Sequence, residues 1–204
     1  MLITSFTQKI EDWALKRKRV YQIAQSYYRD VTHRESVLAN VTEKDHVLCI
    51  GGGVCPFTAI LFHEQTGAKV SVIDKCEHCV EKAKRLIDDL GLSDAITVLT
   101  HNGDCASFPL NRFTVVHFAL QVCPMRNVFH NIEKRVSPGT RLLVRRPKRP
   151  LSNLYSCLPS PLLHSCPVTT HKSVRNIGST LLYIKQGGLS RPVCGSNVNA
   201  GIPA

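Results

Sequence analysis

Between residues 47 and 144, short continuous apolar runs alternate with longer segments whose apolar residues recur at helical spacing. This alternation constrains the fold more than any other feature of the chain. A strand that is apolar throughout, rather than at every second residue, is buried on both faces, as in a parallel sheet covered by helices on either side. We therefore predict an α/β fold with a doubly wound, mostly parallel sheet. Its strands are expected at residues 47–50, 69–73, 96–100, 113–119 and 140–144, and its helices at 56–65, 77–90 and 126–136.

The segments on either side of this alternation differ from it in the spacing of their apolar residues. Residues 5–39 carry apolar side chains at mixed helical spacing and predict two or three N-terminal helices. Near the other end, residues 168–174 and 179–185 predict an antiparallel β-hairpin, and the tail after it has too few apolar residues to order itself. The expected division is an N-terminal helical cap at 1–40, a sheet domain at 41–186 and a flexible tail at 187–204.

Three consecutive glycines, Gly51, Gly52 and Gly53, follow the first predicted strand and open the next helix. Glycine permits a tight turn there and lets the backbone come close to a ligand. Asp74 ends the second predicted strand, where a carboxylate can accept hydrogen bonds from both ribose hydroxyls of a nucleotide. Pro56 replaces the third small residue of a dinucleotide fingerprint, and no Walker lysine follows. The loop therefore predicts a nucleoside ligand without phosphates.

These motifs resemble the S-adenosylmethionine-dependent methyltransferases. Residues 47–53 are similar to the first motif of that family, and Asp74 matches its ribose-binding acidic residue. Asn102-Gly103-Asp104 resembles the segment that meets the adenine amino group. The resemblance implies a seven-stranded Rossmann-like sheet with an antiparallel C-terminal hairpin, and S-adenosyl-L-methionine as cofactor. The cofactor-binding residues that it implies are Gly51, Gly52, Gly53, Asp74, Lys75, Gly103, Asp104, Ala119 and Gln121.

A second, more local resemblance covers residues 51–58, 128–132 and 141–145, which are similar to nicotianamine synthases. Those enzymes share the fold but transfer the aminocarboxypropyl arm of the same cofactor rather than its methyl group. Methyl transfer to a small molecule is our first expectation, and aminocarboxypropyl transfer is the alternative.

Neither reaction needs a dedicated acid or base in a motif, because the protein's main task is to align nucleophile, carbon and leaving sulfur. The sequence therefore leaves the catalytic residues open. Candidates for the substrate side are Tyr27, Tyr28 and Gln121. The expected partner is a small-molecule substrate, and a homodimer is left open.

The formal net charge of +11 raises a third alternative, a non-catalytic nucleic-acid-binding module. The basic clusters at 16–19 and 145–149 lack interleaved aromatic residues, which favours solvated surface. No apolar run is long enough to cross a bilayer, so we expect no membrane association. The nine cysteines are odd in number and no signal peptide is evident, which predicts reduced thiols and a cytoplasmic protein.

Cys76 and Cys79 form the one metal-like spacing in the chain. A structural zinc site needs four ligands, and no second pair with this spacing exists, so we expect no metal. An ordinary helix start is the first interpretation of the pair, and a metal-binding role or a thioredoxin-like redox role stays open as the alternative.

Overall fold

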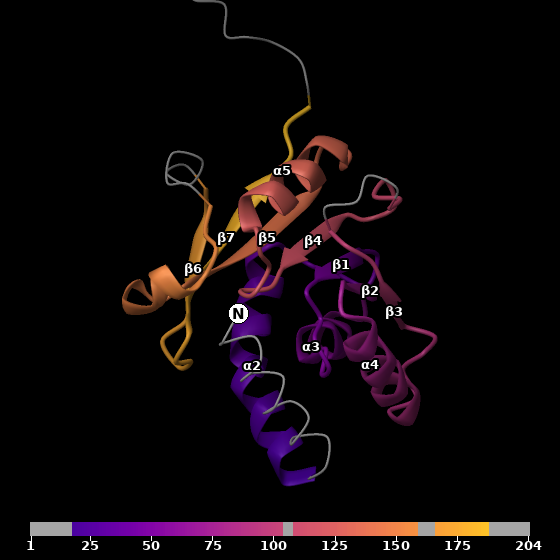
Figure 1. The fold of residues 1–204 in the computed structure, drawn as a ribbon. Helices are drawn as coiled ribbons and strands as arrows, with labels where there is room; N and C mark the ends of the chain where they lie inside the picture. Colours follow the sequence, from indigo (N-terminus) through magenta and orange to yellow (C-terminus); the bar gives the residue numbers. More distant parts are fainter. Residues whose placement is uncertain (1–17, 104–107, 159–165, 188–204) are drawn as a thin grey trace, which may run out of the picture.

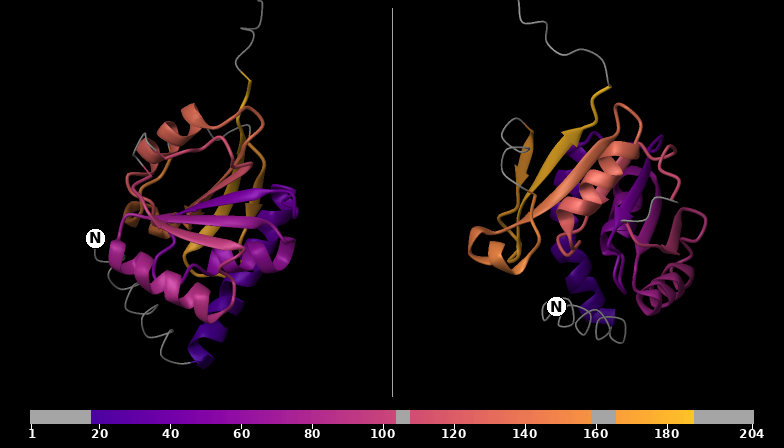
Figure 2. Two further views of the ribbon diagram at one scale, coloured as in Figure 1. Left: turned by 90° about the vertical axis from the view of Figure 1, so that its right-hand side faces the viewer. Right: turned by 45° about the horizontal axis from the view of Figure 1, so that its top comes forward.

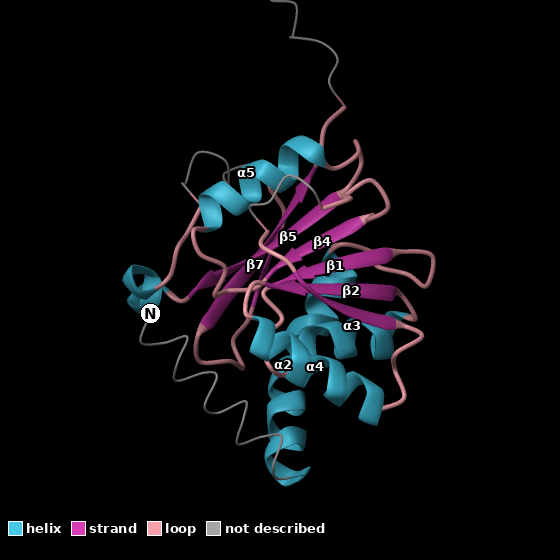
Figure 3. Cartoon of the chain, turned by 45° about the vertical axis from the view of Figure 1, so that its right-hand side comes forward, coloured by secondary structure: helices cyan, strands magenta, loops and turns pink. Residues whose placement is uncertain are grey.

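A computed structural model gives the fold and describes residues 18–103, 108–158 and 166–187, with side chains from residue 25 onward. Seven strands form one sheet in the order β3-β2-β1-β4-β5-β7-β6, and Figures 1 and 3 show its central strands side by side. The first five strands pair in parallel and the last two pair antiparallel. The predicted doubly wound sheet with a C-terminal hairpin is confirmed. The strands are β1 His46–Ile50, β2 Lys69–Asp74, β3 Ile96–Thr100, β4 Val115–Phe118, β5 Arg141–Pro147, β6 Val168–Thr170 and β7 Ile177–Ile184.

Helices cover both faces of this sheet. On one face lie α3 (Phe57–Thr66) and α4 (Glu77–Asp89), and on the other lies α5 (Met125–Arg135). Figure 2 shows the sheet between them. The long helix α2 (Lys18–Leu38) packs against α3 and β6, and the 3-10 helix η1 (Arg149–Leu154) follows β5. No described helix has both the length and the apolar character needed to cross a membrane.

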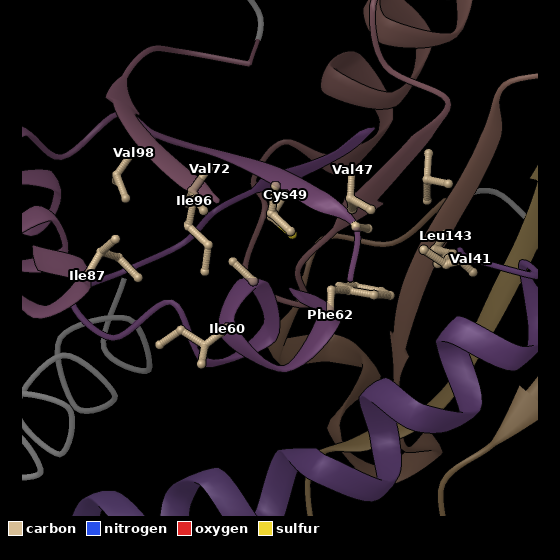
Figure 4. Close-up of a cluster of buried hydrophobic side chains, with 14 of the residues drawn as sticks. Val41, Val47, Cys49, Ile60, Phe62, Val72, Ile87, Ile96, Val98 and Leu143 are labelled. Carbon is tan, nitrogen blue, oxygen red and sulfur yellow. The ribbon is translucent and has the colours of Figure 1, made fainter. Parts of the chain in front are cut away.

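Strand β1 explains why the sequence reads as continuous apolar runs. Neighbouring residues of a strand point to opposite faces of the sheet. Val47 and Cys49 belong to the cluster beneath α3 and α4, shown in Figure 4, whereas Leu48 and Ile50 belong to the cluster beneath α5. Because both faces are covered, the strand has no polar side.

The chain ends differ from the sequence expectation in detail. In the hairpin, β6 is shorter than expected and β7 begins two residues earlier, at Ile177, so six residues connect them instead of four. The described part of the N-terminal segment is one continuous helix, because neither glycine nor proline interrupts residues 18–38. The rest of that segment and the tail from 188 lie outside the described residues. The number of N-terminal helices and the domain boundaries therefore stay predictions.

Candidate functional site

The carboxyl ends of β1, β2 and β4 surround a cavity of about 200 Å³. Strand order reverses between β1 and β4, which makes this edge the place where doubly wound sheets bind ligands. The cavity walls come from the loop after β1, the ends of β2 and β4, and one residue each of α2 and β5, Tyr28 and Arg145.

The glycine loop fits tightly against the strands on either side of it. Gly51 has φ of 84° and Gly53 has φ of 62°, a left-handed conformation that strains other residues. A Cβ on Gly51 would lie 3.3 Å from atoms of both Ala119 and Val122. A Cβ on Gly52 would lie 2.2 Å from Cγ1 of Val72, which is a severe clash. The backbone therefore lines the cavity where side chains would fill it.

Asp74 ties this loop to the end of β2. Its Oδ2 accepts a hydrogen bond from the Gly53 backbone N–H at 2.9 Å, and its Oδ1 accepts one from the Cys76 backbone N–H at 3.0 Å. Each carboxylate oxygen can accept a second hydrogen bond. The carboxylate is thus held beside the cavity with acceptor capacity left for the hydroxyls of a ribose.

A buried ion pair forms part of the opposite wall. The Nε and Nη2 atoms of Arg145 donate to the two carboxylate oxygens of Glu35, each at 2.8 Å, and the Thr180 hydroxyl donates to the same carboxylate at 2.6 Å. Burial pushes the pKa of Glu35 upward, but the positive charge of Arg145 and its hydrogen bonds to the carboxylate outweigh it and hold the pKa well below its usual range. Glu35 is therefore ionised and fixes the position of Arg145.

Arg145 in turn reaches the cavity. Its Nη1 donates to the Thr58 hydroxyl at 3.0 Å, and its guanidinium carbon lies 5.6 Å from the centre of the Tyr28 ring. The three side chains all line the cavity. The Tyr28 ring also stacks on Phe57, at 6.1 Å between ring centres. The hydrogen bonds of Arg145 to Glu35 and Thr58 thus fix the guanidinium on this wall.

His117 lies beside the ion pair at the end of β4. Its side chain is 1% exposed, and its Nε2 lies 3.4 Å from a Glu35 oxygen. Burial and the charge of Arg145 lower the pKa of His117, so its imidazole is neutral near pH 7. The cavity is thus lined by a neutral imidazole next to a fixed guanidinium.

The sequence model of the family described as nicotianamine synthase protein matches residues 26–165. The chain belongs to the nicotianamine synthase family. The match includes Glu35, the glycine loop, Asp74 and Arg145, so it spans both walls of the cavity. No curated protein sequence matches the chain.

Solved structures resemble this nicotianamine synthase family member in fold. The E81Q mutant of MtNAS has a TM-score of 0.73 at 21% identity, over 91% of this chain and 72% of that one. The same mutant in complex with S-adenosylmethionine has a TM-score of 0.73 at 22% identity, over 91% of this chain and 74% of that one. An RNA methyltransferase from Salinibacter ruber in complex with S-adenosyl-L-homocysteine has a TM-score of 0.58 at 16% identity, over 79% of this chain and 94% of that one. These neighbours confirm the Rossmann-like methyltransferase fold, and the ligands of the second and third agree with the expected cofactor.

Most of the residues predicted for the site in this family member come together around the cavity. Tyr27 does not: its hydroxyl donates to Asn176 Oδ1 and accepts from the Arg175 N–H, both at 2.8 Å, and so anchors α2 to the loop before β7. Asp104 lies outside the described residues. Those that line the cavity are Tyr28, Gly51, Gly52, Gly53, Asp74, Lys75, Gly103, Ala119 and Gln121.

Sequence reasoning missed Glu35, His117 and Arg145. Arg145 was counted with a solvated basic cluster, but it points from β5 to the face beneath α2, while the neighbouring Arg146 is exposed. Because neighbouring residues of a strand point to opposite faces of the sheet, the sequence already indicated that Arg145 and Arg146 lie on different faces. Glu35 lies on a buried helical stripe with Thr32, Ser36 and Ala39, and this spacing was the available signal on α2.

The cysteines near this edge do not form a metal site in the part of the chain that the structure describes. No group of three or more His, Cys, Asp or Glu side chains there could hold a metal ion. Cys55, Cys76 and Cys123 line the cavity, whereas Cys79 is buried in α4.

Proposed function

We propose that this chain binds S-adenosylmethionine in the cavity and transfers the aminocarboxypropyl group of that cofactor to a small-molecule nucleophile. The observation that carries the proposal is the nicotianamine synthase family match, which spans the glycine loop, Asp74 and the Glu35–Arg145 pair. Methyl transfer, the first expectation from the sequence, has support only from fold similarity.

The residues of the cavity fit this cofactor. Asp74 has free acceptor capacity for the ribose hydroxyls, and Gly51 and Gly53 let the backbone lie against the ligand. At Gly103, which also lines the cavity, a Cβ would lie 2.9 Å from Cγ1 of Val128, so glycine lets the backbone pack closely on α5 there. S-adenosylmethionine supplies a sulfonium centre whose carbon–sulfur bonds are open to displacement by a nucleophile.

The opposite wall would orient the nucleophile. Tyr28, His117 and Arg145 come from three different elements and meet around Glu35: Arg145 forms the buried ion pair, His117 lies 3.4 Å from the same carboxylate, and the Tyr28 ring lies against the guanidinium. Fixing the reacting groups in space is a large contribution that a protein can make to such a displacement. Neutral His117 is also able to accept the proton that the nucleophile loses.

Product analysis tests this proposal directly. The full chain would first be titrated with S-adenosylmethionine by calorimetry, with NAD as the comparison ligand. It would then be incubated with S-adenosylmethionine and a mixture of the common amino acids as nucleophiles, and the nucleoside product identified by mass. Release of 5'-methylthioadenosine supports aminocarboxypropyl transfer, and release of S-adenosylhomocysteine would instead establish methyl transfer. Salt-sensitive RNA binding without cofactor turnover would favour a nucleic-acid-binding module.

A further inference from the structure

Two cysteines lie at the start of α4, directly behind the cofactor cavity. Cys76 is the N-cap of the helix, and its sulfur accepts the backbone N–H of Cys79 at 3.3 Å. Residues one helical turn apart have Cα atoms within the roughly 4–7 Å range that a disulfide spans. Neither cysteine is part of a disulfide in the structure. The backbone therefore already holds the two residues close enough for a sulfur–sulfur bond.

The two thiols differ in exposure. Cys79 is 2% exposed, whereas Cys76 is half-buried and lines the cavity. The N–H groups at a helix start stabilise negative charge, and the thiolate is the nucleophilic form of cysteine. The pair thus combines an accessible attacking thiol with an enclosed second thiol one turn away, which suits thiol–disulfide exchange within a pair.

The pair is also linked to the cofactor wall. The Cys76 N–H donates to Asp74 Oδ1, and the other oxygen of the same carboxylate accepts the Gly53 N–H. Since Cys76 lines the cavity, we expect a cofactor bound there to restrict the access of a small molecule to its sulfur. The effect of a bound cofactor on Cys76, unlike the chemistry of the cysteine pair itself, rests on the proposed function.

We propose that Cys76 and Cys79 form a redox-active dithiol in the wall of the cavity, and that bound S-adenosylmethionine protects it from oxidation. The oxidant is a small-molecule disulfide such as oxidised glutathione. The Cys76 thiolate attacks one sulfur of that disulfide, the sulfur–sulfur bond breaks, and one glutathione thiol leaves. Cys79 then loses its proton and attacks the Cys76 sulfur, which releases the second glutathione thiol. Two electrons pass from the protein to the oxidant, and the two thiol protons end on the released thiols.

Peptide mass analysis tests the dithiol without any activity measurement. Lys75 and Lys82 flank the pair, so trypsin releases residues 76–82 as a peptide that contains both cysteines and no other. The reduced full chain would be treated with oxidised glutathione, alkylated with iodoacetamide and digested. We expect this peptide without alkyl groups and lighter by two hydrogen atoms, and we expect reductant to restore the dialkylated form.

Single substitutions separate the two roles. Cys79→Ser should accumulate glutathione on Cys76, because no second thiol releases it. Cys76→Ser should leave Cys79 reduced, and it should keep the helix start because serine is a good N-cap. Cys123→Ser removes another exposed thiol of the cavity and should change nothing. The proposal is overturned if peptide 76–82 stays dialkylated while the exposed Cys157 acquires glutathione, or if Cys79→Ser behaves like the unsubstituted chain.

A last measurement tests the coupling. With S-adenosylmethionine at 100 times its Kd, oxidation of the pair should slow by about 100-fold, since only the free protein reacts. Unchanged oxidation in a chain that calorimetry shows to bind S-adenosylmethionine would overturn the coupling. Disulfide formation in a chain that does not bind S-adenosylmethionine would leave the dithiol established and instead remove the proposed function.

Discussion

The two walls of the cavity are built in opposite ways. The wall at Asp74 is local: its hydrogen bonds join residues that are 2 and 21 positions apart in the sequence. The wall at Arg145 joins α2, β5 and β7, with partners 110 and 145 positions apart. The first depends on backbone shape and exposed polar atoms, and the second depends on a charge pair shielded from water. The difference predicts that substitution of Asp74 acts mainly on ligand binding and that substitution within the buried pair acts mainly on stability, and the following substitutions test that separation.

The largest effect is expected from breaking the buried pair. Arg145→Met leaves the Glu35 carboxylate buried without its counter-charge, which should lower the free energy of unfolding by about 3–5 kcal/mol. Urea denaturation measures it. The double variant Glu35→Leu with Arg145→Met removes both charges and should be more stable than Arg145→Met alone. Strictly additive losses would show that the pair does not act as a unit.

Asp74→Ala should act on binding far more than on stability. Hydrogen bonds to a charged group contribute about 1.5–3 kcal/mol, so affinity for S-adenosylmethionine should fall by roughly 10- to 100-fold. Calorimetric titration measures the loss. Asp74→Asn keeps one side-chain acceptor and should lose less. An unchanged affinity in Asp74→Ala would remove the ribose assignment.

Gly52→Ala should disturb the loop by overpacking. The new methyl group would meet Val72, and such a clash typically costs about 1–3 kcal/mol of unfolding free energy. Adding Val72→Ala creates space on the neighbouring strand, so the double variant should be more stable than the sum of the two single losses predicts. Thermal unfolding of the three variants checks this, and simple additivity would mean that the clash is relieved by another movement.

The smallest effect is a dependence of stability on pH. Burial is the main cause that lowers the pKa values of His46, His117 and His171 below the ordinary value of 6.5. The unfolded chain therefore binds more protons than the folded one below about pH 6.5, so stability should fall as pH drops through this range. Denaturation at pH 7 and at pH 5.5 measures it. His117→Phe should weaken the dependence, and an identical slope in that variant would assign it to the other histidines.

The sequence predicted the local wall at Asp74 but not the wall at Arg145. The alternation of strands and helices, the glycine loop and Asp74 depend on apolar periodicity and on residues close together in the chain, and all were predicted. The pairing of Glu35 with Arg145 depends on how α2 crosses β5, which no local pattern encodes. The exact start of β7 was also missed, because its pairing with β5 begins at Ile177, within the residues expected to form the turn.

The Thr180 hydroxyl bond to Glu35 has a consequence for how the site matures. Thr180 belongs to the final strand, yet it steadies a carboxylate contributed by the first described helix. During ribosomal synthesis the wall at Arg145 is therefore completed only after β7 has emerged and paired with β5. A nascent chain halted before that point carries its glycine loop and Asp74 but has an incomplete wall at Arg145.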